Sequence, residues 1–351
     1  MHWQVEIAFL ALKSNEASKE QVAFQKEIDN LSASIEKNRN ELDELSSSIE
    51  STNNSAESSA APLERLKGKE NITQSGQRID ICANVGTRED IEMFRSDAGG
   101  IGLFRSEFLY MEMGSKLPSE EQLFQVYKLA AESMGANRVV VRIADFGGDK
   151  MVESVDLGEQ ANPAIGLRGI RIMMEKEELF LPQFRAILRA SALGNVSIMF
   201  PMITSMEEVA AAKALLEKAK KQLKDEKTAY NENIEIGVMI ETPAAVMISG
   251  ELAREVDFFS IGTNDLLQLT LGMDRENPKL DKYYNPYHPA LMKMIRIVAN
   301  NVHLEGKRIS ICGDLAADLS MTEFFVQIGI DELSVAPHQV LGLRKKIREI
   351  Q

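Results

Sequence analysis

Several apolar runs of the chain end in side chains that could bind an anion, hold a cation or donate a proton. Arg105 and Arg142 end two of these runs, Glu241 and Asp265 follow two others, and Cys312 ends the run "RISIC". Guanidinium groups bind phosphate oxygens bidentately, and carboxylates are preferred ligands of Mg²⁺. A thiol can serve as nucleophile, metal ligand or acid. These residue types indicate chemistry on a phosphorylated substrate with a metal ion.

The predicted anion site includes more than two arginines. Arg275 lies just beyond the sixth apolar run in "MDREN", and Asn264 follows that run in "GTND". A charged side chain at the end of an apolar strand is costly to bury without a partner. Three arginines that converge with an asparagine therefore predict an anion site. For any single arginine an internal ion pair is the alternative, for instance Arg105 with Asp145.

Glu241 and Asp265 are predicted at the ends of neighbouring strands, whose backbones lie roughly 5 Å apart. Two carboxylates at that distance repel each other unless a cation lies between them. Mg²⁺ binds one or two carboxylates together with water and substrate oxygens, so the pair predicts a Mg²⁺ site. The alternative is that one carboxyl is protonated or paired with Arg275.

The two cysteines differ in position. Cys82 lies within the first apolar run, where a buried cysteine acts as a small apolar residue, whereas Cys312 ends a run beside the predicted arginines and carboxylates. No histidine belongs to the strand-end set to deprotonate Cys312, so general acid is its predicted role. None of the four histidines lies in a setting that predicts a phosphoryl carrier.

Eight apolar runs alternate with segments of helical periodicity, such as 120–134 and 205–226. Runs that are apolar throughout predict strands buried on both faces and paired in parallel. Their count and spacing predict a (β/α)8 TIM barrel, in which the site lies at the carboxyl ends of the strands. A doubly wound open sheet is the alternative, although no G-x-G-x-x-G follows the first run. The runs are 79–86, 100–107, 138–147, 195–203, 234–242, 257–266, 308–316 and 332–337.

Residues 1–62 differ in composition from the rest of the chain and predict a helical appendage that ends in a Ser- and Asn-rich linker. Its apolar residues follow a heptad pattern with one polar layer, which leaves open a coiled coil, a helical hairpin or a solvated helix on the main domain. The heptad positions are Phe24, Ile28, Leu31, Ile35, Asn38, Leu42, Leu45 and Ile49. The second predicted domain, the barrel, covers 71–351.

Composition excludes several classes of protein. The chain has 351 residues, 44% of them hydrophobic, so it can form a large core, and its net charge of −13 argues against nucleic acid as the main partner. Two cysteines far apart predict a reducing compartment, and we expect a cytoplasmic protein. No apolar run is long enough to predict membrane insertion.

Seven ordered motifs resemble the C-terminal phosphoenolpyruvate-binding barrel of enzyme I of the bacterial sugar phosphotransferase system. The likeness runs from about residue 71 to 350. Pyruvate phosphate dikinase and phosphoenolpyruvate synthase share this type of barrel and are an alternative, but the motif spacings are nearer to enzyme I. The motifs are "GGIGLFRSEFLYM", "VVVRIADFGGDK", "GNVSIMFPMI", "IGVMIETPAA", "VDFFSIGTNDLLQLTLGMDR", "YNPYHP" and "ICGDLAAD".

The resemblance implies a phosphotransferase that passes the phosphoryl group of phosphoenolpyruvate to a histidine on a separate domain and releases pyruvate. It implies that Cys312 protonates C3 of the enolate and that Mg²⁺ is held by Glu241 and Asp265. It further implies a phosphate site and a homodimer. The phosphate site comprises Arg105, Arg142, Asn264 and Arg275, next to Asp265.

The chain departs from the family pattern at Ile143, Asp314 and Ala317, where Thr, Glu and Gly are usual, and it has no phosphohistidine motif. We therefore expect a fragment or divided protein that phosphorylates a partner in trans. The alternative is a relative that only senses phosphoenolpyruvate. A Mg²⁺-dependent lyase or aldolase of oxoacids is a further possibility, against which several phosphate-facing arginines argue.

Overall fold

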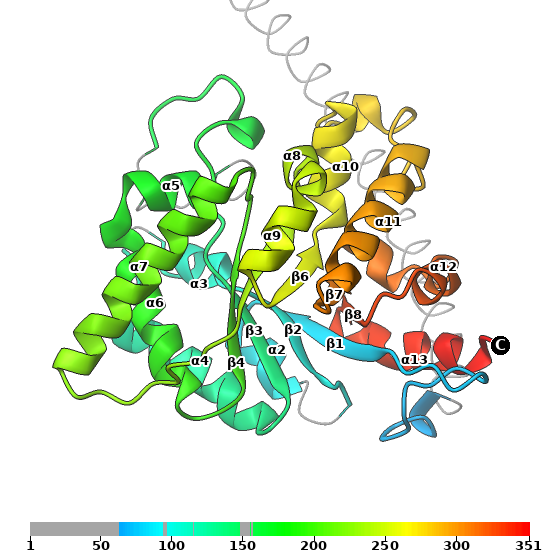
Figure 1. The fold of residues 1–351 in the computed structure, drawn as a ribbon, viewed down its shortest axis with the longest axis horizontal. Helices are drawn as coiled ribbons and strands as arrows, with labels where there is room; N and C mark the ends of the chain where they lie inside the picture. The colour runs from blue at the N-terminus through cyan, green and yellow to red at the C-terminus, as the bar shows by residue number, and fades with distance from the viewer. Residues whose placement is uncertain (1–62, 94–96, 115, 148–154, 156) are drawn as a thin grey trace, which may run out of the picture. The chain divides into compact units, whose positions relative to one another are not determined.

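The protein forms a closed barrel of parallel strands that pair in chain order, with β8 closing on β1 (Figure 1). The structure, a computed structural model, describes residues 63–351 except 94–96, 115, 148–154 and 156. The predicted (β/α)8 barrel is confirmed, and the open sheet is wrong. The appendage predicted over 1–62 lies outside the described residues. The strands are β1 (Asp80–Val85), β2 (Gly100–Arg105), β3 (Arg138–Arg142), β4 (Val196–Phe200), β5 (Ile236–Ile240), β6 (Phe258–Ile261), β7 (Arg308–Ile311) and β8 (Glu332–Val335).

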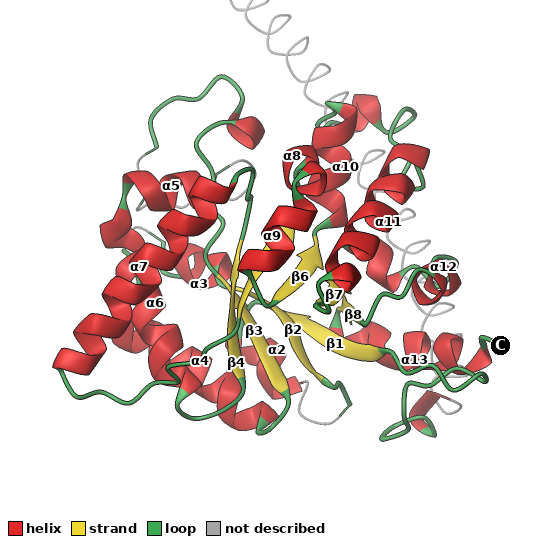
Figure 2. Ribbon diagram, in the orientation of Figure 1, coloured by secondary structure: helices red, strands yellow, loops and turns green. Residues whose placement is uncertain are grey.

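Helices surround the strands on the outside of the barrel (Figure 2). Among the described helices none is both long and apolar enough to cross a bilayer. The α-helices are α2 (Arg88–Met93), α3 (Glu107–Glu112), α4 (Glu120–Met134), α5 (Ile170–Glu175), α6 (Glu177–Ser191), α7 (Met206–Asp225), α8 (Pro243–Met247), α9 (Ser249–Glu255), α10 (Thr263–Leu271), α11 (Pro289–Leu304), α12 (Thr322–Gln327) and α13 (Val340–Glu349). Short 3₁₀ helices are η1 (Pro163–Ile165), η2 (Pro278–Leu280), η3 (Asp314–Ala317) and η4 (Pro337–Gln339).

The two long helices expected from periodicity, α4 and α7, begin with the same local signal. The Ser119 hydroxyl accepts from the backbone N of Gln122 at 3.3 Å, and the Gln122 side chain accepts from the backbone N of Ser119 at 2.9 Å. Ser205 and Glu208 form the equivalent capping box before α7. Reciprocal bonds of this kind satisfy backbone donors that have no partner inside a helix. These capping residues therefore determine where both helices start.

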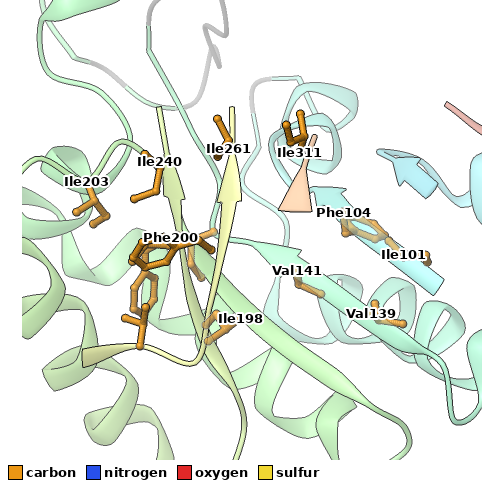
Figure 3. Packing of buried hydrophobic residues seen from close by; sticks show 14 of the residues in the cluster. Ile101, Phe104, Val139, Val141, Ile198, Phe200, Ile203, Ile240, Ile261 and Ile311 are labelled. Atoms are coloured by element: carbon orange, nitrogen blue, oxygen red, sulfur yellow. The ribbon is translucent and has the colours of Figure 1, made fainter. Parts of the chain in front are cut away.

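Strand side chains alternate between two apolar cores. Outward-facing residues such as Ile198, Ile240 and Ile261 pack in one continuous core with the helices (Figure 3). The inward-facing set forms a separate cluster inside the barrel, as the two-residue period of a strand requires. Its members are Leu103, Val140, Met199, Met239, Phe258 and Cys312.

Every strand ends before its apolar run does, and for β6 and β7 this changes the element that carries predicted site residues. β6 ends at Ile261, and Asn264 and Asp265 lie in the first turn of α10 rather than at a strand end. The backbone N of Leu266 bonds to the carbonyl of Gly262 at 3.0 Å, which starts the helix at once. Cys312 follows β7, whose last residue is Ile311. These side chains are thus presented by strand-to-helix turns at the carboxyl-end rim of the barrel.

A buried arginine of α13 ties the segment before β1 to the barrel. Arg344, with only 3% of its surface exposed, donates from Nε to Asn71 Oδ1 at 2.8 Å and from Nη1 to the Leu66 carbonyl at 2.9 Å. It also pairs with the Asp97 carboxylate at 3.4 Å and bonds to the Asp97 carbonyl. One guanidinium thus joins three segments that are distant in sequence.

Replacing this arginine should weaken the fold measurably. We expect Arg344→Met to lower the free energy of unfolding by about 3 kcal/mol, because several buried acceptors lose their donor. Urea-induced unfolding measures the change. Arg348→Met is the matched control on the same helix, because Arg348 donates one exposed bond to the Glu70 carbonyl. Its cost should stay below about 1 kcal/mol, and equal losses in the two variants would contradict the role of Arg344.

Candidate active site

A cavity of about 130 Å³ opens at the carboxyl-end rim, and all seven side chains predicted for the site line it. These seven are Arg105, Arg142, Glu241, Asn264, Asp265, Arg275 and Cys312. The remaining lining residues are Asn84, Leu103, Met239, Gly262, Gly313 and Asp314. Segments far apart in sequence therefore bring cationic, anionic and thiol groups to one small space.

Arg105 and Arg142 at the rim each retain an unused hydrogen-bond donor. Arg142 is buried and pairs through Nη2 with Glu107, while its Nη1 lies 3.9 Å from Asp145. Within the described residues, the buried Nε atoms of Arg142 and Arg105 have no hydrogen-bond acceptor. An unsatisfied buried donor costs about 1–3 kcal/mol. An oxyanion in the cavity would offset this cost, which is why these side chains fit an anion site.

Arg168 is the residue of this region that the sequence reasoning missed. Its side chain is 1% exposed and binds both oxygens of Asp145, at 3.2 and 3.0 Å, and Asp265 Oδ1 at 2.8 Å. Asp145, considered from sequence as a partner of Arg105, is thus held by a different arginine. Arg168 lies between η1 and α5, away from any strand end. The length of the connection between β3 and α5 was the available signal, since long connections are usually functional.

Glu241 is a buried carboxyl that follows β5 directly, and it is 1% exposed. Its Oε1 accepts from the backbone N of Met202 at 2.6 Å. Burial, followed by repulsion from Asp265 and Asp145, raises the pKa of Glu241 to about 7. The predicted pairing of one of the two carboxyls with Arg275 is also present, because Asp265 Oδ2 lies 3.7 Å from Arg275 Nη1.

The carboxylate oxygens of Glu241 and Asp265 are suitable ligands for a hard divalent cation. Glu241 Oε2 lies 2.8 Å from the point that a Cβ on Gly262 would occupy, so glycine avoids a clash with this carboxylate. A cation beside Glu241 and Asp265 would relieve the repulsion that raises the Glu241 pKa. No group of three or more His, Cys, Asp or Glu ligands occurs in the described part of the chain. Two carboxylates completed by water and substrate oxygens match the preference of Mg²⁺.

Cys312 carries a buried thiol, and the residue is 7% exposed. Its backbone N donates to the Ile261 carbonyl at 3.2 Å, and its Sγ lies 3.5 Å from the same oxygen. Burial raises the pKa of the thiol to about 11, although Ser260 and Arg142 act in the opposite direction. The sulfur is therefore protonated at neutral pH, as a general acid must be at the start of its reaction.

The turns after β6 and β7 pack closely against each other. The Asn264 Oδ1 accepts from the backbone N of Asp314 at 3.0 Å, which leaves the Nδ2 group to donate elsewhere. A Cβ on Gly313 would lie 2.8 Å from the backbone N of Thr263, so glycine is required there by contact between the two turns. Of the departures from the family pattern, Asp314 lines the cavity and Ile143 is buried in the outer core.

Fold and site together define a (β/α)8 barrel with an arginine- and carboxylate-lined pocket at its carboxyl-end rim. The sequence profile described as "PEP-utilising enzyme, PEP-binding domain" matches residues 60–351, and the chain belongs to this family.

Curated relatives support the same assignment. A phosphoenolpyruvate-protein phosphotransferase of Haemophilus influenzae is 44% identical over 291 residues, which cover 83% of this chain and 50% of the relative. One of Staphylococcus carnosus is 41% identical over 289 residues, covering 82% and 50% respectively. The chain spans about half the length of the curated relatives it matches.

The raised pKa of Glu241 predicts how the stability of the metal-free protein depends on pH. Its folded value, about 7, lies above the ordinary value of 4.5, so the folded state binds more protons between these pH values. The contribution of this carboxyl to stability is therefore present below pH 4.5 and falls as pH rises towards 7, by roughly 3 kcal/mol.

Urea unfolding at several pH values tests this expectation. Glu241→Gln keeps an acceptor for Met202 but does not titrate, so its stability should fall less steeply than that of the wild type over the same window. Added Mg²⁺ should reduce the difference, because it favours the ionised carboxylate. Parallel pH profiles for wild type and variant would show that the carboxyl is not perturbed.

Proposed function

We propose that this chain binds phosphoenolpyruvate in the rim cavity and, with Mg²⁺, transfers its phosphoryl group to a histidine on a separate domain or protein, releasing pyruvate. One observation carries the proposal: three arginines, the carboxylates of Glu241 and Asp265 and a protonated thiol line the same cavity. Membership in the family of PEP-binding domains and the names of the curated relatives support it.

Each charged group then has a role in the reaction. Arg105, Arg142 and Arg275 bind the phosphate oxygens, and Asn264 donates its amide to one of them. Positive charge held in place around the transferring group stabilises the charge that develops on its oxygens. Arg142 keeps its charge, because Glu107 and Asp145 outweigh the effect of burial and raise its pKa.

Glu241 and Asp265 are the residues that would hold Mg²⁺. The ion would supply Lewis-acid stabilisation of negative charge on phosphate and enolate oxygens. Arg168 keeps Asp265 oriented through its bond to Oδ1, so that Oδ2 faces the rim side where Arg275 lies. The carboxylates are thus positioned by the protein before any cation arrives.

Cys312 completes the reaction by protonating C3 of the enolate. The bond between phosphorus and the enol oxygen breaks, and the phosphoryl group passes to a ring nitrogen of the acceptor histidine. The electron pair left on the enol oxygen forms the carbonyl of pyruvate, and C3 takes the proton from Cys312 Sγ. The thiolate regains a proton from solvent after pyruvate leaves.

In this proposal the acceptor histidine belongs to a separate domain or protein. None of the described histidines lines the cavity. His288 accepts from the backbone N of Ala290 at 3.2 Å, and His303 lies 3.5 Å from Asp331. We also propose that the protein acts as a homodimer in the cytoplasm, where its two buried, free cysteines remain reduced.

Loss of the thiol should stop proton transfer without preventing binding. In D₂O with Mg²⁺, inorganic phosphate and pyruvate, the wild-type chain should exchange the methyl protons of pyruvate, as measured by ¹H NMR. Cys312→Ala should lower this rate by about 100-fold or more. Cys82→Ala removes the other buried thiol, which lies outside the cavity, and should exchange like the wild type. Wild-type exchange no faster than buffer would refute the proposed chemistry.

Removal of one phosphate-binding cation should weaken substrate binding. We expect Arg105→Gln to raise the Kd of phosphoenolpyruvate about 10- to 100-fold, the range of a charge-assisted hydrogen bond. Titration calorimetry in the presence of Mg²⁺ measures this change. Arg78→Gln, at the amino-end mouth of the barrel, is the matched control and should leave the Kd unchanged. A similar Kd for Arg105→Gln and the wild type would remove Arg105 from the phosphate site.

A further inference from the structure

Asn84 is a rim residue that no motif in the sequence singled out. It lies in β1, where Ile81, Ala83 and Val85 belong to the outer core. By strand alternation its side chain points to the inside of the barrel, and it lines the rim cavity together with Cys312. A polar side chain at this inward position needs hydrogen-bond partners within the barrel.

Its carboxamide is fully committed to two other segments of the barrel. Nδ2 donates to the carbonyl of Cys312 at 3.2 Å and to the carbonyl of Ser334 at 3.0 Å. Oδ1 accepts from the Ser334 hydroxyl at 2.6 Å. Both N–H bonds of the amide face carbonyl oxygens, which fixes its orientation and leaves no donor for a substrate. The side chain therefore holds protein atoms in place and has no N–H left to donate to an anionic ligand.

The bond to Cys312 lies where the barrel is least well paired. β7 and β8 share two residue pairs, Ser310 with Glu332 and Ile311 with Leu333. Cys312 comes one residue after this ladder ends. Its backbone N is held on the β6 side by Ile261, and its carbonyl is held by Asn84. The asparagine thus supplies a hydrogen bond at the point where the ladder to β8 stops.

Ser334 fixes the asparagine in turn, and a glycine makes room for it. A Cβ on Gly102 of β2 would lie 2.5 Å from the Ser334 Oγ, so any larger residue at that position would displace the hydroxyl. The same glycine also makes room for the Glu332 carboxylate, whose Oε1 would lie 2.4 Å from that Cβ. Side chains locked by such a second layer of bonds hold reacting groups more accurately than those without one.

We propose that Asn84, supported by Ser334, is a positioning residue that fixes the Cys312 thiol at the distance from C3 of the substrate that proton transfer requires. The inference rests on the proposed function, because it assigns Cys312 as the proton donor. A displacement of about 1 Å at a reacting group can cost roughly 100-fold in rate. Loss of Asn84 should accordingly affect proton transfer while leaving substrate affinity intact.

The first test compares exchange with binding in the same variants. Asn84→Ala should lower the rate of pyruvate methyl exchange in D₂O roughly 10- to 100-fold. Its Kd for phosphoenolpyruvate should stay within about threefold of the wild type, since the amide has no N–H left to donate to the ligand. Ser334→Ala removes one of the three bonds and serves as the milder variant, with an intermediate loss. Ser310→Ala is the matched control, because this inward serine of β7 bonds to the Phe259 carbonyl and not to Asn84.

The second test needs no substrate. In a Cys82→Ala background, the rate at which iodoacetamide alkylates Cys312 reports how firmly the thiol is held. Loss of a hydrogen bond worth about 1 kcal/mol should speed alkylation about fivefold in Asn84→Ala, with Ser310→Ala unchanged. Exchange and alkylation that match the wild type in Asn84→Ala would overturn the proposal.

The two measurements also separate this inference from the proposed function. If the wild type neither exchanges pyruvate nor binds phosphoenolpyruvate, the proposed function fails, and with it the role of Asn84 in proton transfer. Faster alkylation in Asn84→Ala would then still show that this residue holds the sulfur in place. Unchanged alkylation together with normal wild-type exchange would count against Asn84 alone.

Discussion

The ion pairs of Arg168 with Asp145 and Asp265 are the interaction on which the rim depends. Buried carboxylates are tolerated only when cations or hydrogen bonds balance them, and this guanidinium serves two of them. Glu241 lies beside the same group, but Arg142 and Arg168 only partly offset its burial and the repulsion from its neighbours. The unbalanced negative charge of the rim is therefore concentrated on one carboxyl. A divalent ion bound beside Glu241 would balance this charge.

The inside of the barrel contains apolar side chains that pack against one another and buried serines near the rim. Methionine, leucine and phenylalanine pack below the rim, whereas Ser260 of β6 and Ser334 of β8 are buried serines that act on Cys312 and Asn84. Ser260 lowers the pKa of the Cys312 thiol, against the stronger effect of burial. Ser334 orients Asn84. A barrel interior filled only with branched aliphatic residues would pack as well, but it could not orient a thiol.

Much of this arrangement could be predicted from the sequence. Apolar runs identify buried parallel strands, and the rule that barrel sites lie at strand ends led to seven residues that do line one cavity. Arg168 escaped this reasoning because it lies between η1 and α5 rather than after a strand. Asn84 escaped because a polar residue inside a strand gives no sign of what it faces. Which arginine pairs with which carboxylate depends on side-chain geometry that spacing along the chain does not encode.

The short contact between β7 and β8 has a consequence for how the protein fluctuates. A junction of two residue pairs separates at a lower free energy than the four-pair junction of β1 with β8, so its amides should be among the first in the barrel to exchange with solvent. Each such opening would increase the exposure of the buried Cys312 sulfur to water and to any dissolved oxidant. Oxidation of the Cys312 thiol should therefore follow local opening at the junction of β7 and β8 rather than global unfolding.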